Sequence, residues 1–269
     1  STRTVDIELD VPPPDISASL SDHGYKEKIA VIREAIAAGD VYQVCYTVRA
    51  NIGPISGSQL AALLCRNGLP RFFAWVRLPD GQEFLSASPE LFFETESRQV
   101  HAEPMKGTAR SGDAAGLDLS EKDRAELAMI TDLLRNDLTP TCKPRTVEVP
   151  CDRRTIVLPY AVQTVSDITG ELIDDATPLD VLAALHPGGS VTGAPKLAAL
   201  DFIRNLEPTP RGPYCGALGL WRGDRSVFSL LIRTATKTPA GWEYGVGSGV
   251  VYDSDPDSEH AELLIKLGA

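Results

Sequence analysis

Residues 71–102, RFFAWVRLPDGQEFLSASPELFFETESRQVHA, decide the fold class of this 269-residue chain. Two apolar segments, 71–77 and 83–87, flank Pro79-Asp80-Gly81, a turn signature that predicts a β-hairpin. Residues 91–96 and 99–102 continue the antiparallel pattern. Further strands are predicted at 41–50, 214–221, 226–236 and 242–252, and helices at 25–38, 58–66, 120–138, 178–186, 195–206 and 256–267. Because the strands come in runs and do not alternate one by one with helices, the predicted class is α+β with mostly antiparallel sheets.

The composition is that of a globular protein and excludes several classes. With 43% apolar and 23% charged residues, disorder, collagen and a disulfide-stapled scaffold are excluded. The 26 Lys and Arg against 37 Asp and Glu give a net charge of −11, which repels polyanions. No segment approaches the ~18 to 20 uncharged apolar residues of a membrane span, and no basic segment precedes an apolar one at the start. We therefore expect a cytoplasmic protein with neither nucleic acid nor membrane as a partner.

The predicted domain organisation is simple. Residues 1–24 contain an alternating apolar run, Val5 to Leu9, and three prolines at 12–14, which predicts an N-terminal edge strand and a linker. Residues 25–269 are predicted to form one larger domain. The five cysteines are odd in number and lack the spacing of metal ligands, so we expect free thiols in a reducing compartment.

Two acidic sets suggest a cation site without establishing one. Glu259, Glu262 and Lys266 are spaced so that they project from one face of the last helix. On an isolated helix, the ordinary interpretation is a solvated face with an ion pair between Glu262 and Lys266. Asp123 and Glu126 form a second acidic set in the 120–138 helix. Carboxylates from two helices could jointly hold a hard cation such as Mg²⁺, and both interpretations stay open.

Two glycine-rich segments share features with ligand-binding loops. Residues 188–196 lead into a helix whose N-terminus suits an anion, but they lack the Lys-Ser/Thr of a phosphate loop. A structural turn and an anion site both remain open there. Residues 245–249 lead into a strand, which argues against a dinucleotide fingerprint.

Two further positions carry polar side chains where function is plausible. Gln43, Cys45 and Thr47 alternate along the 41–50 strand and give it a semi-polar face that suits the wall of a cleft. Lys106 is predicted to lie in a polar loop whose backbone is fixed by its proline and glycine neighbours. A merely solvated lysine is the ordinary interpretation of such a position.

Eight motifs occur in one order along the chain. They are GDVYQV (39–44), SPEL (88–91), PMKGT (104–108), AE with DLLRNDL (125–126 and 132–138), PGGSVTGAPK (187–196), RGPYCGA (211–217), IRT (232–234) and the helix with Glu259, Glu262 and Lys266. Over about residues 25 to 267 this order resembles that of the chorismate-utilising enzymes, and eight ordered motifs are far more specific than one. The resemblance implies two antiparallel sheets packed face to face, flanked by helices, with the substrate cleft between them. It makes residues 25–269 the chorismate-binding catalytic domain.

Within this family, the chain most resembles aminodeoxychorismate synthase component I, the para-aminobenzoate branch. Lys106 stands where the anthranilate and isochorismate branches usually have a small residue. It implies that the amine attacks C2 of chorismate as the C4 hydroxyl leaves, and that ammonia then attacks C4 and expels the lysine. The attack needs a neutral amine, so we expect burial, Mg²⁺, Lys266 and Arg233 to lower the pKa of Lys106. Gln43 stands where water-adding relatives carry a lysine base, which favours ammonia as the nucleophile, and Thr108 completes the catalytic set.

The resemblance also implies a binding set. Mg²⁺ is the implied cofactor, held by Glu126, Glu259 and Glu262. The pyruvyl carboxylate would contact Tyr214, Arg233 and the backbone amides of Gly247, Ser248 and Gly249. Lys266 would pair with a carboxylate oxygen of chorismate, and Ser190 would reach the ring or its hydroxyl.

The chain departs from the family pattern at several points. Gln163 stands where most relatives have a histidine, Cys45 replaces a common asparagine, and Thr139-Pro140 replaces Gly-Arg. Much of the N-terminal portion of typical members is also missing. The expected function is conversion of chorismate and ammonia to 4-amino-4-deoxychorismate, with a separate glutamine amidotransferase subunit supplying the ammonia. Two alternatives stay open: an anthranilate-type or specialised-metabolism aminating synthase, and a non-catalytic chorismate-binding protein, which Gln163 would explain.

Overall fold

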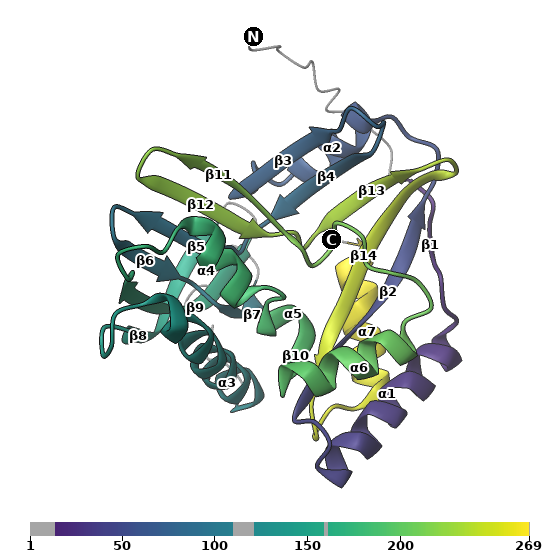
Figure 1. Ribbon diagram of the computed structural model, residues 1–269. Helices are drawn as coiled ribbons and strands as arrows, with labels where there is room; N and C mark the ends of the chain where they lie inside the picture. The colour runs from purple at the N-terminus through teal and green to yellow at the C-terminus, as the bar shows by residue number, and fades with distance from the viewer. Residues whose placement is uncertain (1–13, 110–120, 159–160, 269) are drawn as a thin grey trace.

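Two antiparallel β-sheets organise the chain in the computed structural model, which describes residues 14–109, 121–158 and 161–268 (Figure 1). Sheet A has the strand order β1 (Ile16–Ala18), β2 (Gln43–Ile52), β14 (Gly241–Val250), β13 (Thr234–Thr238), β4 (Glu83–Ser88) and β3 (Phe72–Arg77), with β10 (Gly193–Ala194) also paired to β2. Sheet B has the order β11 (Ala217–Arg222), β12 (Arg225–Leu230), β5 (Leu91–Glu96), β6 (Gln99–Ala102), β9 (Ala161–Glu171) and β7 (Met105–Ala109), with β8 (Glu148–Leu158) also paired to β9. The predicted α+β class with antiparallel sheets is confirmed.

Helices cover the two sheets separately. They are α1 (Asp22–Ala38), α2 (Gly57–Cys65), α3 (Glu121–Leu138), α4 (Pro178–Leu185), α5 (Gly189–Thr192), α6 (Lys196–Leu206) and α7 (Pro256–Gly268), with a short 3-10 helix at Thr139–Thr141. Apolar residues of α1, α6 and α7 share a core with β2 and β14, whereas α3 and α4 share another core with sheet B (Figure 1). Each sheet therefore buries one face against its own helices.

Local sequence signals explain the main boundaries. The Ser21 side chain accepts from Gly24 N–H and starts α1, and Gly39, with φ of 86°, ends it in a left-handed conformation. In the hairpin of β3 and β4, Asp80 Oδ1 accepts from Gln82 N–H, and Gly81 adopts φ of 89°. The predicted hairpin is confirmed, because these turn residues suit that geometry.

One predicted strand, 226–236, is wrong as a single element. The chain forms β12 in sheet B, crosses over, and forms β13 in sheet A. The change of sheet takes place at residues 231–233, where Arg233 has φ of 50°. A continuous apolar run does not reveal that its two halves belong to different sheets.

Three of the longer strands, β7, β8 and β9, lie where none was predicted. Strands β8 and β9 form a long hairpin, and β7 occupies the segment predicted as the polar loop of Lys106. Among the described strands, β8 pairs with β9 alone, and it carries charged residues such as Asp152, Arg153 and Arg154. Charged edge strands lack the apolar alternation on which strand prediction depends.

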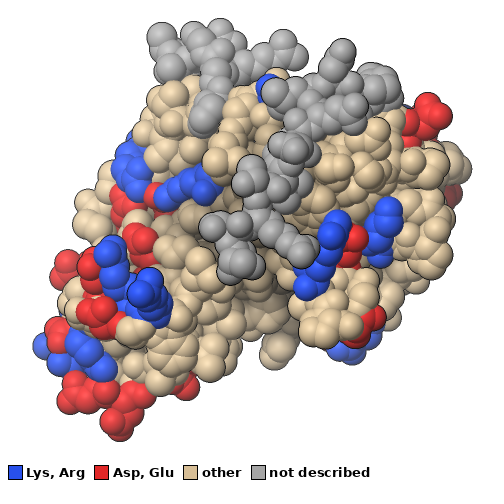
Figure 2. All heavy atoms as spheres, turned by 90° about the horizontal axis from the view of Figure 1, so that it is seen from above, with Lys and Arg blue, Asp and Glu red and all other residues tan. Residues whose placement is uncertain are grey.

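The N-terminal region is only partly described. The alternating run at Val5 to Leu9 lies outside the described residues, whereas β1 pairs with β2 and α1 already begins at Asp22. None of the described helices is long and apolar enough to cross a membrane. In the view of Figure 2, basic side chains lie among acidic ones and form no continuous basic surface.

Candidate active site

Lys106 lies on β7, and its amine is buried against α3. The pairing of β7 with β9 shifts register between Lys106 and Thr108, around Gly107 with φ of 70°. Lys106 Nζ donates to Glu126 Oε2 at 2.7 Å, and the two side chains are 17% and 8% exposed. Burial is the largest single influence and lowers the pKa of Lys106, but the charge and hydrogen bond of Glu126, together with Cys45 and Glu90, outweigh burial, so the pKa is raised. The predicted lowering is wrong for this arrangement, because acidic groups surround the amine.

Gln43 reaches the same place from sheet A. It is the first residue of β2 and has no exposed surface. Neither its amide oxygen nor its amide nitrogen has a hydrogen-bond partner in the described part of the chain. A Cβ at Gly249 would lie 2.5 Å from Gln43 Nε2 and 3.5 Å from Glu126 Oε2. Because Gly249 has no side chain, the Gln43 amide and the Glu126 carboxylate can come together beside Lys106.

Glu90 is a functional candidate that the sequence analysis assigned no role. Its carboxyl is 5% exposed, and Oε1 accepts from Ser190 Oγ at 3.2 Å. Burial raises the pKa of Glu90 to about 7, although the Lys106 charge and the Ser190 hydrogen bond oppose the rise. The one available signal was an acidic residue between Pro89 and the apolar start of β5, where a carboxylate is unexpected. Glu90 and Ser190 thus form a second polar pair near Lys106.

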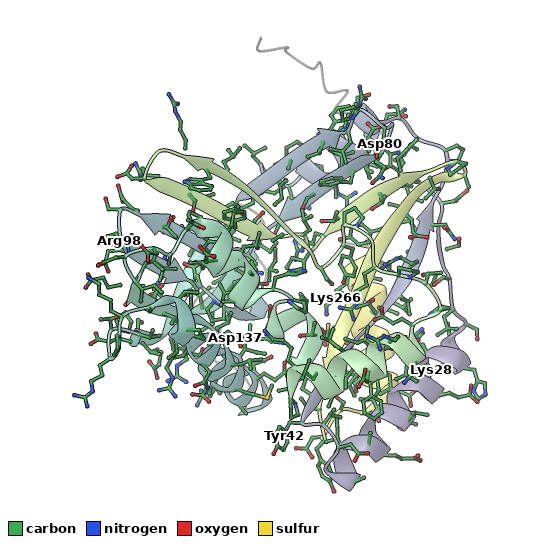
Figure 3. All side chains as sticks on the ribbon, in the orientation of Figure 1. Lys28, Tyr42, Asp80, Arg98, Asp137 and Lys266 are labelled. Carbon is green, nitrogen blue, oxygen red and sulfur yellow. The ribbon has the colours of Figure 1, made fainter. Side chains whose placement is uncertain are left out.

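Lys266 and Glu262 of α7 lie beside β14. Lys266 Nζ donates to Gly247 O at 2.8 Å and pairs with Glu262 Oε1 at 2.7 Å. Figure 3 shows Lys266 near the middle of the molecule. The ordinary i,i+4 ion pair therefore forms, and it does so at the predicted substrate-binding segment.

Two further contacts of β14, at Ser248 and Gly245, lie on opposite faces of the strand. Ser248 Oγ and Tyr25 Oη lie 3.1 Å apart, which commits the Ser248 side chain to α1. The Tyr214 ring packs on Gly245, where a Cβ would lie 2.3 Å from it, and the Arg49 guanidinium lies 5.3 Å from the ring centre. Gly245 and Gly249 are four residues apart, about 13 Å along a strand. The Tyr214 ring, which packs on Gly245, is therefore separated from Gly249 along β14.

Two further predicted site residues, Arg233 and Thr108, lie at the edge of the site. Arg233 is half-buried at the crossover between the sheets, and its positive charge opposes the burial that raises the pKa of Tyr244 on β14. Thr108 pairs with Gln163 across β7 and β9, and its side chain lies outside the described residues. Thr108 therefore borders the site through β7, and Arg233 borders it through the crossover between the sheets.

The predicted magnesium ligands are near one another in the fold but are not gathered into one set. Glu126 binds Lys106, Glu262 binds Lys266, and Glu259 Oε1 accepts from Ser254 Oγ at 2.6 Å. Glu259 and Glu262 both raise the pKa of Tyr25, though less than burial does, so both approach Ser248 from α7. Their oxygen donors suit Mg²⁺ in chemical type, and Glu126 reaches the neighbouring Gly249. The residues fit the ion, provided that Glu126 and Glu262 release their lysines.

A different trio has the tightest cluster of potential ligand atoms. In the described ranges, His101, Glu103 and Asp167 are the residues whose ligand atoms all lie within 4.8 Å of one another. Arg154 donates to both carboxylates of this trio. A guanidinium in that position supplies the positive charge that a cation would bring, so the trio is an ion network.

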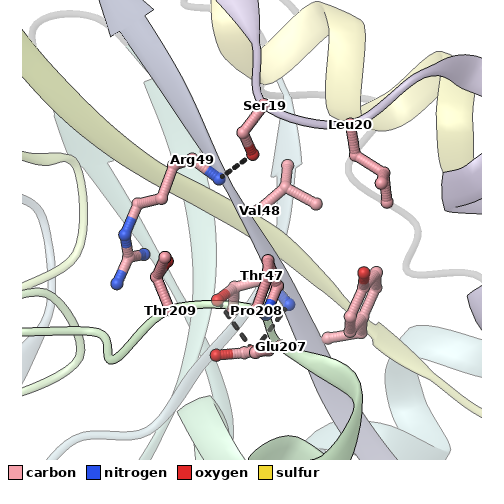
Figure 4. A pocket seen from close by; sticks show the side chains of 9 residues that line it. Ser19, Leu20, Thr47, Val48, Arg49, Glu207, Pro208 and Thr209 are labelled. Atoms are coloured by element: carbon pink, nitrogen blue, oxygen red, sulfur yellow. Dashed lines mark hydrogen bonds between the residues drawn. The ribbon is translucent and has the colours of Figure 1, made fainter.

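A small cavity beside β2 is separate from the candidate site. Figure 4 shows Thr47 and Glu207 in its wall, and Thr47 N–H and Oγ1 donate to Glu207 Oε1 at 3.0 and 2.8 Å. Its volume is about 10 Å³, which is too small for an organic ligand. Glu207 also binds Arg211, whose Nη2 donates to Cys45 O at 2.7 Å. Beyond Gln43, the polar face of β2 therefore has a structural role: Cys45 and Thr47 contact Arg211 and Glu207.

The departures from the family pattern occupy structured positions. Gln163 is buried on β9, between Thr108 on one side and Ile156 on the other. Asp137 Oδ2 accepts from Lys196 Nζ at 2.6 Å and ties the end of α3 to the start of α6. Burial raises the pKa of the Cys45 thiol, which disfavours its thiolate.

Comparisons with known proteins show the family to which this chain belongs. Residues 2–269 match the chorismate binding enzyme family. Aminodeoxychorismate synthase component 1 of Salmonella typhimurium is 37% identical over 256 residues, covering 90% of this chain and 56% of the relative. Anthranilate synthase component 1 1 of Haloarcula marismortui is 36% identical over 255 residues, covering 90% of this chain and 51% of the relative. The crystal structure of anthranilate synthase component I from Streptococcus pneumoniae superposes with a TM-score of 0.85 at 27% identity, covering 97% of this chain and 60% of that one. The chain spans about half the length of the curated relatives it matches, and it belongs to the chorismate binding enzyme family.

Proposed function

We propose that this chain aminates chorismate at C4 with ammonia, giving 4-amino-4-deoxychorismate through a covalent adduct of Lys106. The observation that carries this proposal is the buried amine of Lys106 in contact with Glu126, beside Gln43 and Glu90. A lysine with only a structural role would not need an unpaired buried amide and a second carboxyl around it. A relative that aminates the same substrate type supports the assignment by its printed name, aminodeoxychorismate synthase component 1.

The reaction divides into two displacements. The neutral Lys106 amine forms a bond to C2 of the ring, the ring double bonds shift, and the C4 hydroxyl leaves. Ammonia then forms a bond to C4, the double bonds shift back, and the C2–N bond breaks to return the amine. The sum consumes chorismate and ammonia and releases the product and water. Because Glu126 raises the pKa of Lys106, the amine has to separate from that carboxylate before it attacks.

Glu90 would protonate the departing hydroxyl. Its pKa of about 7 leaves a sizeable protonated fraction at neutral pH, and Ser190 holds the carboxyl at 3.2 Å. This supplies the acid that Gln163 cannot provide in place of the usual histidine. Gln43 Oε1 is a buried acceptor for an N–H of ammonia, and an amide cannot activate water as a base.

Magnesium belongs to the same proposal. Glu126, Glu259 and Glu262 would hold the ion, which neutralises charge on the ring carboxylate when bound. Tyr214, Arg233, Lys266 and the backbone of Gly247, Ser248 and Gly249 would orient the pyruvyl side of the substrate. We further propose that a glutamine amidotransferase subunit delivers the ammonia, which agrees with the component 1 designation of the relatives.

Intact-protein mass spectrometry tests the covalent step. Incubation with chorismate and Mg²⁺ but no ammonium should give an adduct of one chorismate less one water, located on Lys106 by peptide mapping. Lys106→Ala should abolish the adduct and lower amination by about a thousandfold or more. Lys28→Ala on α1 is the matched lysine control and should behave as the natural chain. An adduct that persists in Lys106→Ala would end the covalent mechanism.

An anthranilate-type reaction is the second candidate, because anthranilate synthase relatives match about as well as aminodeoxychorismate synthases. Product analysis with chorismate, Mg²⁺ and ammonium separates the two. Amino-deoxychorismate with nitrogen at C4 supports the first proposal, whereas 2-amino products or anthranilate support the second.

A further inference from the structure

The strand that carries Lys106 is attached to its sheet at a short junction. Strands β6 and β7 pair with successive parts of β9, with only Glu103 and Pro104 between them. Ser166 N–H donates to Pro104 O at 3.1 Å, which ties the backbone of the junction to β9. The Glu103 side chain at this junction is almost wholly buried, at 1% exposure. A buried carboxylate needs charged or hydrogen-bonding partners to offset its desolvation.

Those partners come from both sheets. Glu103 Oε1 accepts from Nη1 of Arg71, the residue that precedes β3 of sheet A. Glu103 Oε2 accepts from Nη2 of Arg154 on β8 of sheet B. Arg154 also donates to Asp167 Oδ2 and Oδ1 at 2.6 and 2.8 Å, and Asp167 Oδ1 lies 2.8 Å from His101 Nε2. One carboxylate, three residues before Lys106, therefore joins the two sheets.

Apart from Glu103, whose negative charge adds to the raised pKa of Glu90, the network lies away from the proposed chemistry. Lys106 pairs in register with Thr164. Side chains alternate along a strand, so Asp167 of β9 and Arg154 of β8, which pairs with Val165, lie on the opposite face of the sheet. Of the network's members, only Glu103 adjoins the motif that holds Lys106. Charge-assisted bonds to two guanidinium groups fix a carboxylate in both position and orientation.

We propose that Glu103, held between Arg71 and Arg154, is a positioning residue that sets the place of the Lys106 amine beside Glu126. The expected fall in kcat rests on the proposed function, whereas the expected change in the position of the Lys106 amine does not. Nucleophile placement matters because a displacement of about 1 Å can cost about a hundredfold in rate. A residue that positions the nucleophile should affect kcat and leave substrate binding largely intact.

Kinetics of four variants test the proposal. Glu103→Gln keeps the shape of the side chain and removes its charge, and Arg71→Met removes the partner on sheet A. Each should lower kcat about tenfold or more with KM changed less than about threefold. The double variant should fall no further than the lower single variant, since both act through one contact. Glu94→Gln is the matched control, because Glu94 contacts the far end of the network through His101 Nδ1 at 3.2 Å.

Amine labelling tests the placement of Lys106 without requiring turnover. N-hydroxysuccinimidyl acetate labels accessible lysines, and peptide mapping gives the labelling of Lys106 relative to Lys28. Labelling of Lys106 should rise about threefold or more in Glu103→Gln and Arg71→Met, and should stay unchanged in Glu94→Gln. Circular dichroism confirms that each variant is folded, and Arg71→Met carries the test if Glu103→Gln does not fold.

The outcomes separate this inference from the proposed function. If no variant and not even the natural chain turns over chorismate, the proposed function fails, and labelling alone decides the inference. Equal labelling of Lys106 in the natural chain and both variants would overturn it, with or without a change in kcat. A kcat for Glu103→Gln within twofold of that for Glu94→Gln would overturn it as well.

Discussion

Replacing Glu90 with glutamine should change both the pH dependence of stability and the rate. The pKa of Glu90 is about 7 in the fold against an ordinary value of 4.5, because the carboxyl is buried beside Ser190. The folded chain therefore keeps this proton at pH values where the unfolded chain has released it. Stability from this group is fully present below about pH 4.5 and is lost as the pH rises through about 7. At ~1.4 kcal/mol per pH unit, the total loss is about 3 kcal/mol.

Urea unfolding at several pH values measures this effect. Glu90→Gln lacks the titrating group, so its stability relative to the natural chain should rise by about 2 to 3 kcal/mol between pH 5 and pH 8. Glu96→Gln at the far end of β5, the strand that follows Glu90, is the matched control, because its carboxylate is exposed and pairs with Arg225 at 3.3 Å. Its stability difference should stay within about 0.5 kcal/mol over that range. A flat difference for Glu90→Gln would refute the raised pKa.

The same substitution tests the proposed proton donor. Amination by the natural chain should decline as the pH rises above about 7, because Glu90 loses its proton there. Glu90→Gln should lower kcat by about a hundredfold to ten thousandfold and remove that decline. An unchanged kcat would exclude Glu90 as the acid.

Three other perturbations probe the remaining parts of the site. Gln43→Lys should introduce some addition of water, since a lysine base can activate it, and an isochorismate assay that stays blank counts against this role. Gly249→Ala should lower kcat/KM by about tenfold or more, because its Cβ would lie 2.5 Å from Gln43 Nε2, whereas at the control Gly53→Ala the nearest contact is 3.8 Å. Chelation with EDTA should abolish amination and added Mg²⁺ should restore it, and activity that survives chelation would remove the ion from the proposal.

Much of the architecture could be predicted from local patterns. The turn at Pro79 to Gly81 and the glycine that ends α1 were predicted correctly, because proline and glycine favour particular backbone conformations, whereas the start of α1 was predicted at Tyr25, three residues after its actual start at Asp22. The β8 and β9 hairpin was missed, because β8 is a charged edge strand without alternation. The crossover at Arg233 was missed, because an apolar run does not indicate which sheet each of its halves joins.

The sequence by itself determined the class of the fold, the order of the motifs and the residue types at Lys106 and Gln43. Only the tertiary structure decided that Lys106 meets Glu126, that Glu90 is a buried carboxyl with a raised pKa, and that Glu103 joins the two sheets. The physical reason is that periodicity reports which face of an element is buried. The charge of a site, and hence the protonation of its groups, depends on side chains that distant elements bring to that face.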